Sequence, residues 1–221
     1  MISIIIGGGS LNKDFAGGFI KGFDESSLCI IACDKGYEAC LALGLAPDIV
    51  VGDFDSISEE VKSALDKESA RVIKLNPVKD DTDIEAALNL AIEATAEGDS
   101  IYILGGTGGR IDHLLGNISL LGFGCKKERR VKIVDECNSI QMIASGEKLE
   151  LAKNTQFGKY ISVFPYGGTC TGVTLNGFKY PLTDATVEGF NTLTVSNELV
   201  ESEGFISLEN GYLIICESKD N

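Results

Sequence analysis

The sequence is poor in basic residues, has a single histidine and no tryptophan, and contains no long apolar run. Its 221 residues include 19 lysines and arginines against 33 aspartates and glutamates, which gives a formal charge of −14. This deficit argues against a general binder of nucleic acid or of an anionic membrane, because both need clustered cations. No stretch approaches the roughly 20 apolar residues that span a bilayer. We therefore expect neither a nucleic-acid nor a membrane partner.

Cysteine and histidine also lack the patterns that indicate zinc sites or disulfides. The seven cysteines form no C-x-x-C pair, and one histidine cannot complete the usual ligand spacing. Several cysteines lie inside apolar runs, where buried, reduced thiols are the simplest interpretation. The apolar run at residues 2–6 is short and lacks the basic lead-in of a secretory signal. We expect a cytoplasmic protein.

The first half of the chain alternates short apolar runs with helical patterns. Such alternation predicts a parallel sheet with right-handed crossovers, in which ligands bind beyond the carboxyl ends of the strands. We predict an N-terminal Rossmann-like α/β domain over residues 1–129. The expected strands are residues 2–6, 28–33, 48–51, 71–75 and 100–104, and the expected helices are residues 37–43, 83–96 and 110–121, with another starting at Ser58.

The second half consists of short alternating runs separated by turn signals, without any helix-length periodicity. This texture predicts an all-β sandwich domain over residues 130–221, or a partial barrel. Asn210-Gly211 is typical of a hairpin turn. The expected strands are residues 131–134, 139–143, 148–151, 160–164, 173–175, 192–195, 205–208 and 212–215.

Two aspartates, Asp53 and Asp55, directly follow the third apolar run. Alternation along a strand lets both side chains project the same way from its carboxyl end. Carboxylates held so close repel each other and favour a cation between them, and hard oxygen ligands suit Mg²⁺. The alternative is a solvated turn, since Gly, Asp and Ser are ordinary loop residues. A second acidic cluster makes the metal interpretation the better one.

That second cluster is Lys79-Asp80-Asp81-Thr82-Asp83, at the start of a predicted helix. Asp and Thr at a helix N-terminus cap backbone N–H groups, and we expect Asp81 or Thr82 to do only that. Asp80 and Asp83 remain candidates for completing the metal site. Lys79 is predicted to meet a phosphate.

Glycine-rich segments follow the first and fifth predicted strands. Glycines at residues 7–9, 105–106 and 108–109 would let backbone N–H groups approach a phosphate, and Arg110 could bind it through two hydrogen bonds. Tight turns are the alternative. The second segment is neither a Walker A motif nor the spaced dinucleotide fingerprint. We predict phosphate contacts at Gly8, Gly106 and Arg110. His113 is as suited to capping or packing as to proton transfer, and we assign it no role.

Taken in order, the motifs resemble those of the thiamine pyrophosphokinase (thiamine diphosphokinase) family. The resemblance covers nearly the whole chain. It rests on Asp34-Lys35-Gly36, Gly52-Asp53-Phe54-Asp55-Ser56, Lys79-Asp80-Asp81-Thr82-Asp83, Gly105-Gly106-Thr107-Gly108-Gly109-Arg110-Ile111-Asp112-His113 and Ser196-Asn197-Glu198. The resemblance implies Mg²⁺-dependent transfer of a pyrophosphoryl group from ATP to thiamine, giving thiamine diphosphate and AMP. It also implies a homodimer with active sites where the subunits meet.

Carried onto this chain, the resemblance assigns roles residue by residue. It implies metal-binding roles for Asp53, Asp55 and Asp83, catalytic roles for Asp34, Asp80 and Asp112, a nucleotide-site role for Thr82, and thiamine contacts for Ser196 and Asn197. Asp112 and Asp34 are both candidates for receiving the hydroxyl proton. Animal members use a tryptophan near thiamine, so the absence of tryptophan here leaves the aromatic partner unidentified.

Two alternatives belong to other classes. One is another Mg²⁺-dependent phosphotransferase or phosphohydrolase with a different acceptor, which would share the acidic site at the sheet edge. The other is a non-catalytic binder of thiamine or nucleotide. The concentration of mutually repelling carboxylates weighs against a mere binder.

Overall fold

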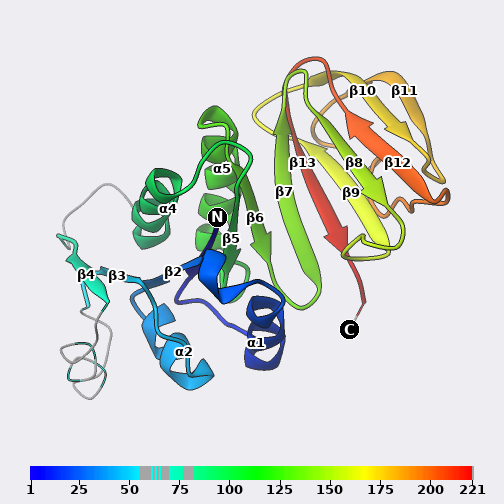
Figure 1. The fold of residues 1–221 in the computed structure, drawn as a ribbon. Coiled ribbons are helices and arrows are strands. Elements are labelled where there is room, and N and C mark those ends of the chain that lie inside the picture. Colours follow the sequence, from blue (N-terminus) through cyan, green and yellow to red (C-terminus); the bar gives the residue numbers. More distant parts are fainter. Residues whose placement is uncertain (55–60, 62, 64, 66–69, 77–81, 221) are drawn as a thin grey trace. The chain divides into compact units, whose positions relative to one another are not determined.

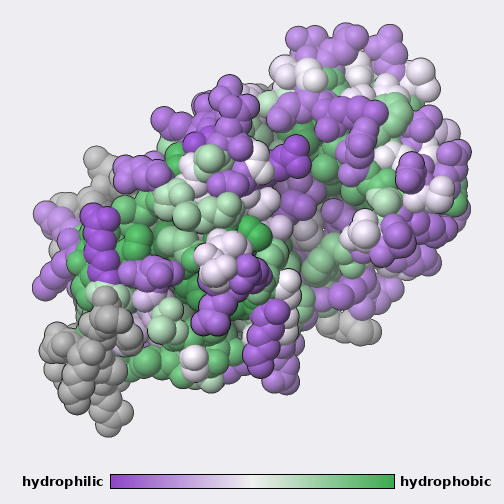
Figure 2. All heavy atoms as spheres, in the orientation of Figure 1, coloured by the Kyte–Doolittle hydropathy of each residue, from purple (hydrophilic) through white to green (hydrophobic). Residues whose placement is uncertain are grey.

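The chain folds into two compact units, Met1–Glu136 and Cys137–Asn221 (Figure 1). The structure is a computed structural model that describes residues 1–54, 61, 63, 65, 70–76 and 82–220. No helix in these described ranges is long and apolar enough to cross a membrane. Hydrophilic side chains cover much of the face drawn in Figure 2, with apolar patches between them.

The first unit is a parallel sheet with strand order β4-β3-β2-β1-β5-β6 and helices on both faces. α1 and α2 lie on one face, and α4 and α5 on the other (Figure 1). The order reverses direction at β1, where sheets of this kind bind their ligands. The elements are β1 (Ile2–Ile6), α1 (Lys13–Lys21), β2 (Leu28–Cys33), α2 (Gly36–Leu43), β3 (Ile49–Gly52), β4 (Arg71–Lys74), α4 (Asp83–Ala94), β5 (Ser100–Leu104), α5 (Ile111–Lys126) and β6 (Arg130–Val134).

Continuous apolar runs explain the central strands. Ile4, Ile5 and Ile6 of β1 are all fully buried, as expected for a strand that is covered by helices on both faces. β6 pairs in parallel with β5, from Ser100↔Arg130 to Leu104↔Val134. It therefore belongs to the first unit, although the sequence placed the expected domain boundary just ahead of it.

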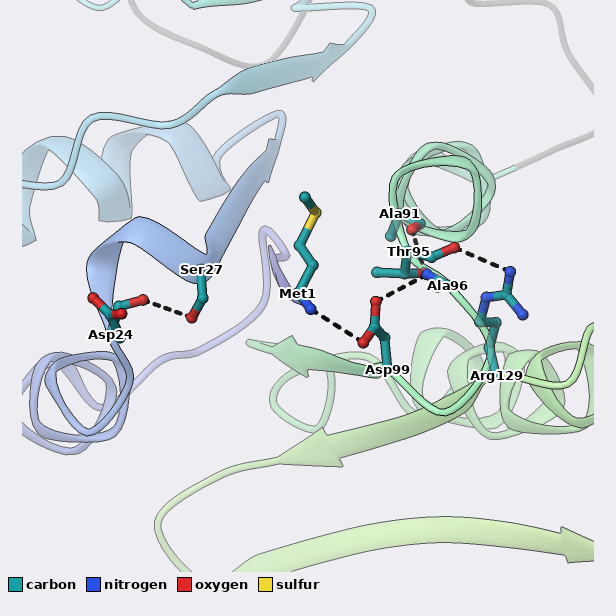
Figure 3. A network of polar contacts seen from close by, with 8 residues as sticks. All are labelled: Met1, Asp24, Ser27, Ala91, Thr95, Ala96, Asp99 and Arg129. Atoms are coloured by element: carbon teal, nitrogen blue, oxygen red, sulfur yellow. Dashed lines mark hydrogen bonds and ion pairs between the residues drawn. The ribbon is translucent and has the colours of Figure 1, made fainter.

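A polar network fastens the amino ends of these strands (Figure 3). The Met1 ammonium group, ahead of β1, donates to Asp99 Oδ1 at 3.1 Å, and Asp99 Oδ2 accepts the N–H of Ala96 at 2.9 Å. Arg129, ahead of β6, donates from Nη2 to the carbonyl oxygen of Thr95 at 3.0 Å. This network lies at the end of the sheet opposite to the carboxyl ends that carry the predicted motifs.

The second unit contains two antiparallel groups of strands, β7-β13-β9 and β11-β10-β12-β8. Both contribute to one buried cluster, for example through Leu213 and Ile215 of β13 and Val173 and Leu175 of β10. This shared core makes the unit a β-sandwich. The strands are β7 (Asn138–Ala144), β8 (Lys148–Ala152), β9 (Tyr160–Pro165), β10 (Cys170–Asn176), β11 (Leu182–Val187), β12 (Glu203–Ser207) and β13 (Tyr212–Ser218).

Three local expectations for this unit were wrong. Residues 192–195 form turns rather than a strand, and β11 was not predicted. Asn210-Gly211 does not close a hairpin, because β12 pairs with β10 and β8 whereas β13 pairs with β7 and β9. Gly211 has a φ of 110°, a conformation that favours glycine, so these residues do form a turn as expected. The turn, however, connects a strand of one sheet to a strand of the other.

Candidate active site

A cavity of about 680 Å³ opens in the first unit beyond the carboxyl ends of β1, β2 and β5. Its position is the one that the parallel topology predicts for a ligand site. Six predicted site residues line it: Gly8, Asp34, Thr82, Asp83, Gly106 and Arg110. The cavity is therefore bordered by carboxyl groups, glycine-rich backbone and a guanidinium group.

Asp34, which follows β2, is held by β3 and by the segment that follows it. Its own φ is 45°, its N–H donates to the carbonyl oxygen of Val51 at 3.0 Å, and its Oδ1 accepts the N–H of Phe54 at 3.3 Å. A Cβ on Gly52 would lie only 2.0 Å from that Oδ1. Gly52 is thus required for the carboxyl group to occupy its place.

The carboxyl group of Asp34 is electrostatically unusual. Partial burial, the neighbouring Asp83 carboxylate with which it shares a hydrogen bond, and the charge of Asp53 raise the pKa of Asp34 to about 6, against the lowering effect of the Phe54 N–H. Adjacent carboxyl groups of this kind are the donors that a hard divalent cation prefers. The Asp34–Asp83 pair therefore offers two donors of the type that such an ion prefers.

The predicted trio Asp53, Asp55 and Asp83 is brought together only in part. Asp53 and Asp83 both act on Asp34, which places their carboxylates in one neighbourhood. Asp55 lies outside the described residues, as do Lys79 and Asp80. Within the described part of the chain, no group of three or more His, Cys, Asp or Glu side chains is arranged to hold a metal ion. The three-carboxylate site stays a prediction.

Thr82 is the N-cap of α4, because its Oγ1 accepts the N–H of Glu85 at 3.2 Å. This geometry agrees with the expectation that Asp81 or Thr82 caps the helix. The hydroxyl group still has a proton to donate, and Thr82 lines the cavity. A phosphate contact by Thr82 is therefore compatible with its capping role.

The two glycine-rich segments pack against each other on the cavity wall. A Cβ on Gly9 would lie 2.4 Å from the carbonyl oxygen of Gly105, and one on Gly108 would lie 2.5 Å from Cβ of Ser10. Gly105 and Gly109 have φ values of 69° and 93°, which disfavour other residues. The glycines are thus needed for this close approach of backbone to backbone.

Arg110 and Asp112 form an exposed ion pair at the start of α5. Arg110 Nη2 lies 2.5 Å from Asp112 Oδ2, and Nε donates to Oδ1 at 3.1 Å. The guanidinium group holds the pKa of Asp112 below its usual range. Asp112 is not among the residues that line the cavity, so the structure places it beside the phosphate-binding candidate and not on the cavity wall.

Three polar residues on the cavity were not predicted: Ser10, Lys35 and Asn117. Lys35 sits in the motif that contains Asp34, and Ser10 directly follows the first run of glycines, so both had a local signal. Asn117 lies in the middle of α5, and only its polarity in an otherwise apolar helix could have indicated it. His113 also lines the cavity.

In the second unit, Ser196 and Asn197 differ in what they can offer a ligand. Ser196 is exposed, has a φ of 57°, and donates its N–H to Ser162 Oγ at 2.9 Å. The side chain of Asn197 is buried. It accepts the N–H of Tyr180 at 3.0 Å and donates to the Tyr180 carbonyl oxygen at 2.8 Å, while the tyrosine itself is 60% exposed.

Comparisons with known proteins agree over both units. A family model described as thiamin pyrophosphokinase, catalytic domain, matches residues 21–134, and one described as thiamin pyrophosphokinase, vitamin B1 binding domain, matches residues 147–213. The thiamine pyrophosphokinase of Bacillus subtilis (strain 168) is 38% identical over 202 residues, covering 91% of this chain and 92% of that protein.

Solved structures extend the likeness to the fold. The crystal structure of thiamine pyrophosphokinase from Bacillus subtilis matches with a TM-score of 0.88 and 36% identity, covering 100% of both chains. The yeast thiamin pyrophosphokinase structure matches with a TM-score of 0.80 at 17% identity, covering 98% of this chain and 86% of that chain, and shows the fold alone.

Fold and site together define an α/β enzyme that handles nucleotide phosphates, with an appended β-sandwich. Both family models and the relative at 38% identity identify the family to which this enzyme belongs. The chain belongs to the thiamine pyrophosphokinase family. The resemblance inferred from the ordered motifs and the predicted fold class are both confirmed.

Proposed function

We propose that this protein transfers a pyrophosphoryl group from ATP to thiamine in a Mg²⁺-dependent reaction that yields thiamine diphosphate and AMP. One observation carries the proposal. A single cavity combines the Asp34–Asp83 carboxyl pair with glycine-rich backbone and Arg110, in a chain whose family models cover a catalytic and a vitamin B1 binding domain.

In the proposed reaction, the thiamine hydroxyl oxygen forms a bond to the β-phosphorus of ATP. The bond breaks between that phosphorus and the oxygen that bridges it to the α-phosphorus, AMP departs with this oxygen, and the hydroxyl proton passes to a carboxylate. Catalysis of this type is mostly positioning and charge neutralisation. We assign the catalytic roles to Asp34, Asp80 and Asp112, with Asp34 on the cavity wall and Asp112 beside Arg110.

The residues proposed to hold Mg²⁺ are Asp53, Asp55 and Asp83. A bound divalent cation would neutralise charge on the phosphoryl oxygens of ATP and relieve the repulsion between neighbouring carboxylates. The raised pKa of Asp34 supports this assignment, because burial and the charges of Asp83 and Asp53 already oppose its ionisation. A protein with a net charge of −14 needs such an ion to accept a nucleotide triphosphate.

Phosphate contacts are proposed for the backbone of Gly8 and Gly106, for Lys79 and Thr82, and for the guanidinium group of Arg110. For Gly8, Thr82, Gly106 and Arg110 the support is their common place in the cavity lining, beside backbone N–H groups and cations that favour anions. Lys79 lies outside the described residues, and its contact is proposed from the sequence motif alone. Lys35, which also lines the cavity, adds a second cation to the described wall.

Thiamine contacts are proposed for Ser196 and Asn197. The Asn197 side chain is hydrogen-bonded to the backbone of Tyr180 and so fixes the position of that residue. We therefore assign the aromatic contact with thiamine to the exposed Tyr180 ring. A tyrosine face can stack on an aromatic cation, and this assignment fills the place that the absence of tryptophan leaves open. The acidic charge of the chain favours a cationic substrate.

We further propose a cytoplasmic homodimer with active sites at the subunit interface. All seven cysteines lie in the described ranges and none is in a disulfide, which suits a reducing compartment. Large apolar side chains are exposed in both units, including Ile111 (72%) and Leu115 (60%) on α5 and Phe190 and Leu193 in the second unit. Light scattering of the purified protein tests the dimer, and a monomer at enzyme concentrations well above the micromolar range contradicts it.

The decisive experiment incubates the protein with ATP, Mg²⁺ and thiamine and quantifies products. We expect AMP and thiamine diphosphate in equal amounts, and neither product when thiamine or Mg²⁺ is left out. AMP or ADP release without thiamine would instead indicate a phosphohydrolase, and release of ADP with thiamine monophosphate would indicate a simple kinase. Tight calorimetric binding of ATP or thiamine without any product would indicate a binder.

A further inference from the structure

Asn117 stands out because its residue type fits neither a helix interior nor an apolar core. It lies in the middle of α5 (Ile111–Lys126), it is only 5% exposed, and it lines the cavity. Asparagine is a poor helix former, and burying a carboxamide is costly unless the group is hydrogen-bonded. Its position therefore calls for a partner that compensates for both effects.

That partner is the glycine-rich segment on the cavity wall. Asn117 Nδ2 donates to the carbonyl oxygen of Gly106 at 2.9 Å, and the bond is buried. A Cβ on Gly106 would lie 3.1 Å from methyl groups of both Ile103 and Ile133, and 3.4 Å from Asn117 Nδ2. Gly106 is thus seated closely between two strands and the helix, with the carboxamide fixing the direction of its carbonyl group.

Fixing one carbonyl group fixes the peptide plane that contains it. Because the peptide unit is planar and trans, the N–H of Thr107 must point opposite to the Gly106 carbonyl group, away from the Asn117 carboxamide. The same segment contains Gly105 and Gly109, whose φ values of 69° and 93° lie in a region that few other residues adopt. Glycines leave the unfolded and locally opened segment many conformations, so one buried hydrogen bond matters for keeping the native one.

We propose that Asn117 is a positioning residue for ATP. It holds the 105–109 backbone in the conformation that presents N–H groups to the phosphates. It acts through the Gly106 carbonyl group and need not touch the nucleotide. This inference rests on the proposed function only for the identity of the ligand, since the constraint on the segment is a property of the protein alone.

The test replaces Asn117 by Leu, which keeps the shape and removes the donor. Losing the bond leaves a buried carbonyl oxygen unpaired, so we expect the KM for ATP to rise about tenfold while the KM for thiamine is unchanged. Hydrogen exchange of the 105–109 amides in the ligand-free protein should accelerate by about tenfold, with the exchange of α5 amides unaltered. If the leucine variant does not fold, Asn117→Ser, whose side chain is smaller, replaces it. We expect the same changes in the KM for ATP and in the exchange of the 105–109 amides.

Asn138→Leu is the matched control. It removes a half-buried carboxamide that accepts a hydrogen bond from Ser218 at 2.9 Å in the second unit. We expect it to lower stability without changing the KM for ATP or the exchange of the 105–109 amides. An Asn117 variant whose segment exchanges like the wild type, or whose two KM values rise together with a loss of stability, overturns the inference. A wild type that makes no AMP refutes the proposed function instead, and the exchange measurement still decides the role of Asn117.

Discussion

Gly52→Ala is the substitution for which the structure makes the sharpest forecast, because it adds one methyl group beside a carboxyl group that it leaves chemically intact. The new Cβ would lie 2.0 Å from Asp34 Oδ1 and 2.8 Å from Asp34 Cγ. Neither distance is tolerable, so the carboxyl group must rotate. It then loses the hydrogen bond from the N–H of Phe54, and its placement next to Asp83 changes.

The expected magnitudes follow from these two losses. A hydrogen bond to a charged group contributes about 1.5–3 kcal/mol, and forcing a methyl group into a packed site costs about 1–3 kcal/mol. Together these amount to about 2.5–6 kcal/mol. Because the displaced group is the end of a half-buried side chain, we expect the lower part of this range, a fall of about 3 kcal/mol in the free energy of unfolding, which lowers Tm by about 6–12 °C for a chain of this size. A displacement of about 1 Å at a reacting group should lower kcat/KM by about 100-fold.

Thermal unfolding and AMP release measure the two effects. Gly18→Ala in α1 is the control, because the same added methyl group meets nothing within 4 Å there, and alanine in a helix interior should raise stability by about 0.5–1 kcal/mol. Wild-type Tm and turnover in the Gly52 variant would show that Asp34 does not need the position that the structure assigns to it.

Three further predictions concern the metal site, the thiamine site and pH. Asp53→Asn and Asp55→Asn should each fold normally yet release little AMP with Mg²⁺, and near-normal turnover in both contradicts the metal assignment. Asn197→Ala removes both bonds to the Tyr180 backbone, so the KM for thiamine should rise about tenfold with an unchanged KM for ATP; equal changes in both contradict the assignment. The pKa of Asp99 is lowered by a backbone N–H and by the N-terminal ammonium group. Its stabilisation is therefore present above the unfolded pKa and lost as the pH falls through the folded one. Asp99→Asn should accordingly be less stable than wild type in denaturant titrations at neutral pH and equal to it in acid.

The sequence was a good guide wherever a short-range pattern carries the information. Runs such as Ile2–Ile6 are too uniformly apolar for a surface strand, and their alternation with helices leaves few topologies. Parallel strands share one carboxyl edge, so the acidic and glycine-rich motifs had to gather there. Gly8, Asp34, Asp83 and Arg110 do line one cavity for this reason.

Short-range patterns failed in the second unit, where partners are distant along the chain. Asn210-Gly211 has the composition of a hairpin turn. The strand before it, β12, nevertheless pairs with β10 and β8, which are distant along the chain, and not with the strand that follows the turn. Segment 192–195 has strand-like residues and lies beside β9, where the N–H of Val163 donates to the carbonyl oxygen of Thr194 at 3.1 Å, but it forms turns and not a ladder. Strand pairing depends on long-range register, which local propensity does not encode.

What the amino-acid sequence determined by itself was the alternation of strands and helices in the first unit and the edge of the sheet at which the cavity opens, because both follow from periodicity and chain direction. Only the tertiary structure decided how individual groups behave. Residues far apart in sequence raise the pKa of Asp34, leave no room for a side chain at Gly52, and turn the Asn197 carboxamide toward Tyr180. Distances of 2–3 Å between such residues set hydrogen bonds, charge and steric room, and no local pattern specifies them.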